Sequence, residues 1–531
     1  MKLPHIFVST CRRAVAVACL AAATHGHAQA AEVPAQEFFG GCPGPIFIAE
    51  DTVVSGKATV EGSCTYGISG FSLAFQDVKL TISGDLYVSG DATTFTIDGS
   101  RITAGGSITL DSLGLLSIVG SKLTSETSFI RLPPRNGAVI EGSSVTAPGD
   151  VTLGGSTGPW TVTDSKLTSG GQLRIAPGTS GGAPIGIYSS TLFSEGRLTL
   201  AGAAHIIHDS ALVTMSSEAS SFNGSMNLGP STFPPVDSEI RRTTLSALNG
   251  TIGLGGNCQF TLEDVDFHAG GAGGANPHES ALSMAPEGVT GTNVSFVADQ
   301  GSVHIGGNGT WTCTDCKIDA AGVNYAGEGV AIGPSSVQLT NAKIRARGGS
   351  IRVGGSGTVT IADSQLQSDT FDADGDAIII GPGGTRTITD SKFKADEGRI
   401  TVTGSSAATV SGSKFTAKLG NGVLFTGSST MTVTDSKIGA KLGDVTAPNG
   451  GSVTFSGNKI KAGGVLGFVA ESGFNGSTDV SENSIKADAA AMRSFQNTTA
   501  LNNDFNVDGT IEISASSTCT SSGNDPDVPC M

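Results

Sequence analysis

A short motif that recurs along this chain constrains its fold more than any other feature. It reads T-V-T-D-S-K-L-T-S at 161–169, T-I-T-D-S-K-F-K-A at 387–395 and T-V-T-D-S-K-I-G-A at 432–440. A repeat of about 20–30 residues is typical of a solenoid, in which each unit buries its apolar face only against its neighbours. The motif therefore predicts a stack of similar coils.

A large apolar residue follows D-S-K or its equivalent in each repeat, and we use it as the anchor of the coil. From Leu80 to Phe505 there are 19 anchors, and the commonest spacing is 22 residues. The longest spacing, 33 residues, leaves no room for a second domain. Apolar and polar residues alternate around each anchor, which indicates strands, and Gly-Gly pairs indicate corners. We therefore expect three short strands in each coil.

A small hydrogen-bonding residue precedes each anchor by two positions in most coils. Such residues beside Asp or Gly are typical of turns, and in stacked coils their side chains would form ladders along the rod. The column consists of Ser100, Ser121, Ser143, Ser165, Ser190, Ser210, Ser364, Ser391, Ser413, Ser436, Asn458, Asn483 and Asn503.

These repeats, from about residue 45 to 510, resemble the right-handed parallel β-helix superfamily of pectate lyases, phage tailspikes and bacterial adhesin passengers. The resemblance implies an all-β chain that forms a single right-handed parallel β-helix of about 19 coils. At about 4.8 Å per coil the rod would be roughly 85–90 Å long. The superfamily includes enzymes and binding proteins, so the resemblance implies no particular activity.

The first 30 residues have the pattern of a secretory signal peptide: a basic start, a short apolar stretch at 14–23 and Ala28-Gln29-Ala30 as a cleavage site. We expect an N-terminal cap and first coils at 31–75, the β-helix at 76–510 and a C-terminal cap or tail at 511–531. No later segment is long and apolar enough to anchor the chain in a membrane. The net charge of -16 argues against a nucleic-acid partner.

The cysteines fit an exported protein with disulfides. Cys42 and Cys64 are one coil apart, and Cys519 and Cys530 bracket a polar tail, so we expect each pair to staple one end. Cys313 and Cys316 lack the further ligands that zinc needs, which favours a local disulfide or two inward thiols. Cys258 is left over, either buried and free or paired between molecules.

Extra residues mark loops that leave alternate coils after Leu245, at 268–280, 322–329 and 369–376. Paired carboxylates can cleave a glycosidic bond, with Glu279, Glu328, Asp374 and Asp376 as the candidates. The alternative is that this edge binds calcium, with Asp369, Asp372, Asp374 and Asp376 as the candidate metal ligands. The third interpretation is a solvated acidic loop, because the set lacks an EF-hand glutamate and the further motifs of polygalacturonases.

A basic residue stands directly before the anchor in many coils, and eight coils carry Asp two positions earlier. This pattern favours either a stripe that binds an anionic glycan or a solvated face on which Asp offsets the repulsion between lysines. The basic column consists of Lys79, Arg101, Lys122, Lys166, Lys317, Lys343, Lys392, Lys414, Lys437 and Lys459.

The regular coils and the few aromatic residues favour a secreted or surface-exposed rod with a structural or adhesive role, without catalysis or a cofactor. Its expected partner is an extracellular glycan or another cell-surface ligand, and its expected location is extracellular, on the cell surface or in the periplasm. The alternative is a lyase or hydrolase of acidic polysaccharide that uses the loop edge at 268–376.

Overall fold

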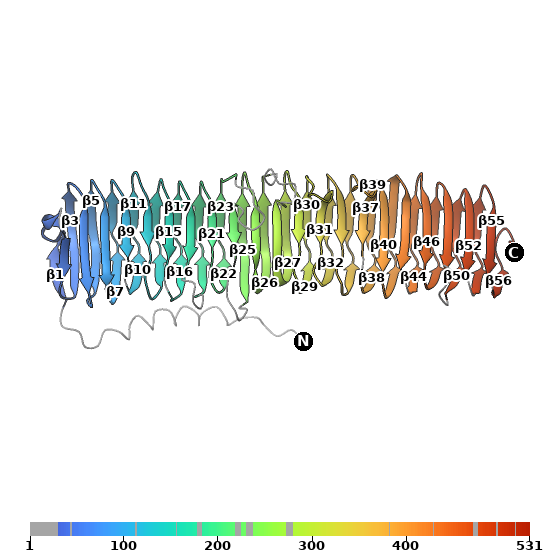
Figure 1. The fold of residues 1–531 in the computed structure, drawn as a ribbon, viewed down its shortest axis with the longest axis horizontal. Coiled ribbons are helices and arrows are strands. Elements are labelled where there is room, and N and C mark those ends of the chain that lie inside the picture. The colour runs from blue at the N-terminus through green and yellow to red at the C-terminus, as the bar shows by residue number, and fades with distance from the viewer. Residues whose placement is uncertain are drawn as a thin grey trace, which may run out of the picture.

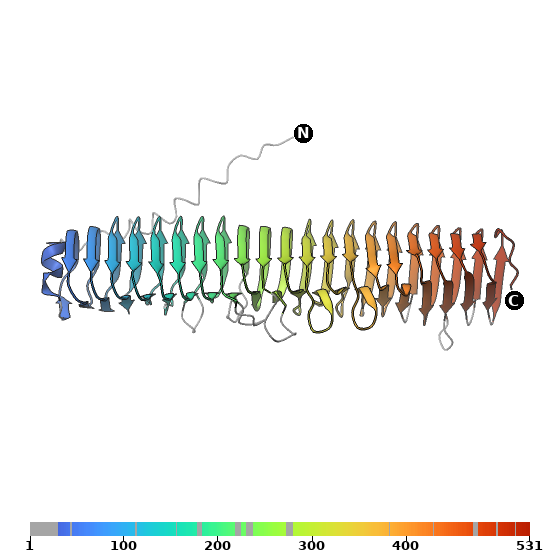
Figure 2. The same cartoon turned by 90° about the horizontal axis from the view of Figure 1, so that it is seen from above.

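The computed structural model of the chain is a straight all-β rod of about 20 turns (Figures 1 and 2). The expected fold class is therefore confirmed. The structure describes residues 30–530 apart from 43–44, 112–113, 156, 178–182, 218–224, 230–236, 272–279, 382, 428–429, 471–475, 495–496 and 516.

Three parallel sheets run along the rod, because most strands pair with the third strand before and after them in the chain. The anchor sheet contains β8 (Arg101–Ala104), β11 (Lys122–Ser125) and β14 (Ser144–Ala147). The second sheet follows it with β9 (Ile108–Asp111), β12 (Ile130–Leu132) and β15 (Val151–Gly154). The third contains β10 (Leu115–Val119), β13 (Ala138–Glu141) and β16 (Trp160–Thr163).

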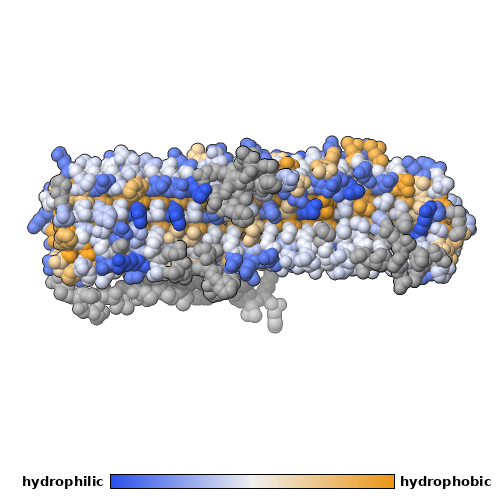
Figure 3. Space-filling model, in the orientation of Figure 1, coloured by the Kyte–Doolittle hydropathy of each residue, from blue (hydrophilic) through white to orange (hydrophobic). Residues whose placement is uncertain are grey.

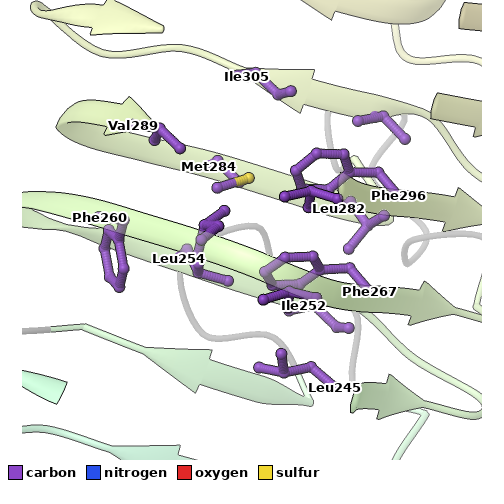
Figure 4. Packing of buried hydrophobic residues seen from close by; sticks show 14 of the residues in the cluster. Leu245, Ile252, Leu254, Phe260, Phe267, Leu282, Met284, Val289, Phe296 and Ile305 are labelled. Atoms are coloured by element: carbon purple, nitrogen blue, oxygen red, sulfur yellow. The ribbon is translucent and has the colours of Figure 1, made fainter. Parts of the chain in front are cut away.

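The anchors point inward and form a continuous column in the core. Figure 4 shows Leu245, Phe267 and Phe296 one above another on successive coils. The rings of Phe267 and Phe296 stack with centroids 5.0 Å apart, and those of Phe393 and Phe415 with centroids 4.7 Å apart. Each coil thus covers the apolar face of the next, as a solenoid requires.

The corner between the third sheet and the anchor sheet explains the aspartate of the motif. All eight aspartates of that column have a left-handed backbone with φ between 48° and 57°. Asp, Asn and Gly adopt this conformation at lower cost than other residues, and the same corner carries Gly99, Gly120, Asn341 and Asn502 on other coils. The aspartate is therefore a corner residue of the backbone.

The predicted ladder of small polar residues is confirmed. The backbone N–H of Ser100 donates to Oγ of Ser121 at 2.9 Å, and the N–H of Ser121 donates to Oγ of Ser143 at 3.0 Å. Asparagine replaces serine in the ladder at Asn458 and Asn483. Their Nδ2 groups also donate to carbonyl oxygens, that of Asn458 to Val433 and that of Asn483 to Phe455. The ladder is buried, so it satisfies the backbone of a corner that water does not reach.

Parallel pairing extends beyond 76–510 at both ends of the rod. At the N-terminus, β1 (Ala31–Pro34) pairs with β3 (Thr52–Val60), and α2 (Ala35–Phe38) and η1 (Phe39–Gly41) follow β1. Ala58 in β3 pairs with the first anchor, Leu80, so this coil lacks the motif but keeps the register. At the C-terminus, β55 (Ile511–Ala515) and β56 (Thr518–Ser522) pair with the preceding coil.

The three expected cysteine pairs have disulfide geometry, with Cα–Cα distances of 5.3 Å for Cys42–Cys64 and 5.9 Å for both Cys313–Cys316 and Cys519–Cys530. Cys258 is buried and has no disulfide partner in the described chain, and burial raises the pKa of its thiol to about 11. Among the described residues, none of the helices has the length and hydrophobicity needed to cross a bilayer.

Candidate functional site

The second and third predicted loops fold into matching turns, visible as two closed arcs in Figure 2. In the first arc, Oδ1 of Asn324 accepts the N–H groups of Ala326 and Glu328, each at 2.9 Å. In the second, Oδ1 of Asp372 accepts the N–H groups of Asp374 and Asp376, each at 3.0 Å. Both turns need a glycine with positive φ, at Gly327 and Gly375. The polar residues of these loops thus have a local structural use.

The carboxylate that closes each loop binds an arginine on the following coil. Glu328 lies 2.6 Å from Nε of Arg352. Asp376 accepts both Nε and Nη2 of Arg399, at 2.7 and 3.1 Å, together with the hydroxyl of Thr401 at 2.7 Å. Glu328 and Asp376 are both 8% exposed. These pairs attach the loops to the second sheet, and the arginines were missed because the contact joins different coils.

The predicted calcium ligands do not converge. Asp369 binds Arg345 at 2.8 Å and accepts from Gln367 at 2.9 Å, whereas Asp372 and Asp376 have the partners given above. Within the described residues, no three or more His, Cys, Asp or Glu side chains gather in a way that could hold a metal ion. Glu279 of the first loop lies outside the described residues.

The structure gives Asp376 and Asp374 different roles, which a matched pair of variants tests. Asp376→Ala would leave the partly buried Arg399 beside an empty, buried position, so we expect the unfolding free energy to fall by about 2 kcal/mol. Asp374→Ala should change it by less than about 0.5 kcal/mol, because this residue is exposed and attracts Arg399 only through a longer-range charge interaction. Urea unfolding of both variants measures the difference. Equal stabilities would contradict the role assigned to Asp376.

A hollow of about 550 Å³ lies beside the first arc, lined by His304, Glu328, Arg352 and several glycines. His304 and Arg352 belong to one outward column of the second sheet, with Ala331 on the coil between them. Partial desolvation lowers the pKa of His304, and Glu328 opposes this shift. The one carboxylate in this described lining is already ion-paired, so the hollow offers no pair of free carboxylates for glycoside cleavage.

The basic column before the anchors forms two runs of four residues in register. The N-terminal basic run is Lys57, Lys79, Arg101 and Lys122, and the C-terminal basic run is Lys392, Lys414, Lys437 and Lys459. All eight side chains are exposed on the anchor sheet. Within the described chain, none of them forms an ion pair, whereas neighbouring Arg347 and Lys394 bind Asp319 and Asp396.

Comparison with known proteins identifies the architecture. Residues 354–525 match the family model described as a right handed beta helix region. The fold is a right-handed parallel β-helix. No curated protein and no solved structure matches the chain, and no specific enzyme family is matched.

Stability of the fold does not explain why like charges lie in register in the two basic runs. Like charges directly opposite on paired strands are destabilising, and two unit charges about 4–5 Å apart repel by about 1 kcal/mol even in bulk water. Aspartates precede some run members, but glycine stands at that corner before Arg101, Lys122, Lys414 and Lys459. Local acidic neighbours therefore offset only part of each run.

A shallow groove of about 500 Å³ follows the corner of the β-helix beside the N-terminal basic run. Its lining includes Arg101, Lys122 and Lys166, and three corner glycines without side chains, Gly99, Gly120 and Gly142. The next outward column of the anchor sheet is threonine on six successive coils: Thr59, Thr81, Thr103, Thr124, Thr146 and Thr168. Short neighbours on both sides leave the basic side chains accessible to a ligand that lies along the rod.

Proposed function

We propose that this β-helix is an exported rod that binds a linear polyanion, an acidic glycan, along the N-terminal basic run without chemical turnover. The observation that carries the proposal is the run itself: four exposed basic side chains in register, without ion pairs in the described chain. A polymer with a negative group on successive units would neutralise a repulsion that the folded protein otherwise carries.

The surroundings of the run support an extended ligand. The groove and the corner glycines follow the rod axis past Arg101, Lys122 and Lys166, so a chain lying there would meet a basic group on three of the five coils that line it, with Asp164 as the one acidic side chain in that lining. The net charge of -16 repels polyanions from the rest of the surface, which favours this face over non-specific binding. The expected signal peptide and the cysteine pairs fit an oxidising compartment outside the cytoplasm.

Neutralising the N-terminal basic run tests the proposal. We expect Lys57→Gln, Lys79→Gln, Arg101→Gln and Lys122→Gln together to weaken heparin binding at low salt by at least about tenfold, because about four charge contacts are lost. The dependence of affinity on salt should also become shallower. Fluorescence anisotropy with end-labelled heparin measures both, with neutral dextran as the reference polymer.

A charge-matched control separates this site from a general charge effect. Arg131→Gln, Arg174→Gln, Lys441→Gln and Lys486→Gln change the net charge equally at exposed positions outside the runs. Equal loss of binding in both variants would sink the proposal. Shortening of heparin or polygalacturonate by the wild-type protein would instead favour the polysaccharide-cleaving alternative.

A further inference from the structure

The two basic runs lie on the same face of one straight rod. Register links them through eleven successive pairings of the anchor sheet, from Lys122 to Lys392. The strands keep their orientation along the rod in both views (Figures 1 and 2). At about 4.8 Å per pairing the gap between the runs is about 50 Å, and the distance from Lys57 to Lys459 is about 80 Å.

The positions between the runs carry a weaker and mixed charge. The column holds Lys166, Lys317 and Lys343, but also Asp266 and neutral residues. Beside it, Asp319 and Asp369 hold Arg347 and Arg345. Charges are screened within about 8–10 Å at physiological salt, so runs about 50 Å apart act as separate electrostatic sites.

We infer that the C-terminal basic run is a second attachment point for the same polymer, so that the rod selects polyanions long enough to reach both runs. This inference rests on the proposed function and specifies its ligand by length. A chain bound at one run holds its other segments near the second run at a high effective concentration. Two joined sites can then exceed the affinity of either one by about 10²–10⁴-fold, whereas a ligand shorter than the gap gains none of this.

End-labelled heparin fractions of two lengths test the inference, one shorter than about 40 Å and one longer than about 90 Å. We expect the wild-type protein to bind the long fraction at least about 100-fold more tightly than the short fraction. Neutralising either run alone, by Lys or Arg→Gln at its four positions, should reduce the affinity for the long fraction to about that for the short one. Each single-run variant should still bind the short fraction, at no fewer than about half of the sites that the wild-type protein offers.

The outcomes separate the two proposals. If the wild-type protein binds the two fractions with equal affinity while neutralising the N-terminal run still weakens binding, the two-site inference is wrong and the binding function stands. If removal of the C-terminal run has no effect and removal of the N-terminal run abolishes all binding, the second attachment point is likewise excluded. If the wild-type protein binds neither fraction at low salt, the proposed function fails and the inference fails with it. The charge-matched control should behave as wild type throughout.

Discussion

We expect Asn483→Ala to lower the free energy of local unfolding of the C-terminal coils by about 3–5 kcal/mol. Asn483 is 2% exposed, and its Oδ1 accepts the N–H of Asn458 at 2.9 Å while its Nδ2 donates to the carbonyl of Phe455 at 2.9 Å. Alanine leaves both backbone groups buried without these partners, at about 1–3 kcal/mol each, and removes the link to Asn503.

Hydrogen exchange detects this effect where it should occur. In a solenoid each coil contacts only its neighbours, so exchange should accelerate around 455–505 and stay unchanged around 100–190. Asn502→Gly is the matched control, because Asn502 is the corner residue of the next coil with φ of 53° and glycine adopts that conformation readily. Equal protection in the two variants would contradict a structural role of the ladder.

Acid is expected to destabilise the rod through His205. This side chain is 0% exposed in β22 (His205–His208), neither ring nitrogen has a hydrogen-bond partner among the described residues, and burial lowers its pKa to about 4. The unfolded chain binds the proton below its ordinary pKa of about 6.5, whereas the folded chain resists protonation until about pH 4. Stability present above pH 6.5 is therefore lost progressively as the pH falls, by about 3 kcal/mol at pH 4.

His205→Leu isolates this contribution from other acid effects. The residue in register on the preceding coil is Ile185, so an aliphatic side chain suits the same core column. Melting temperatures between pH 7 and 4 should decline less steeply in this variant than in the wild-type protein. Parallel declines would show that His205 does not titrate as assigned.

Much of the fold follows from the sequence because a solenoid repeats one local rule. The spacing of the anchors Leu80 to Phe505 predicts the register, and the Ser and Asn column predicts the ladder later seen between Ser100 and Ser121. The sequence placed the aspartate of the motif beside a turn and interpreted its side chain through its charge, whereas the structure shows that the aspartate is itself the left-handed corner residue. Glycine at the same position, as in Gly99 and Gly412, was the available signal, because Gly and Asp share a tolerance for positive φ.

The loop edge was predictable in position but not in its contacts. Irregular spacing located the loops, whereas the pairs Glu328–Arg352 and Asp376–Arg399 join different coils and depend on side-chain direction. The density of acidic residues suggested a metal or catalytic site. In the structure, most of these residues bind arginine side chains or backbone N–H groups. The basic runs differ from these acidic residues, because their side chains form no ion pairs in the described chain. This difference becomes visible only when the structure places every neighbour.

Amine-reactive footprinting with and without heparin tests most directly whether a polyanion lies along the basic runs. Lys57, Lys79 and Lys122 should lose reactivity on binding, together with the lysines of the C-terminal run when the heparin is long enough to reach both. Lys441 and Lys486, exposed elsewhere on the rod, should react unchanged. Protection confined to residues outside the runs, or undiminished labelling of Lys79 and Lys122 at saturating heparin, would contradict the proposed binding face.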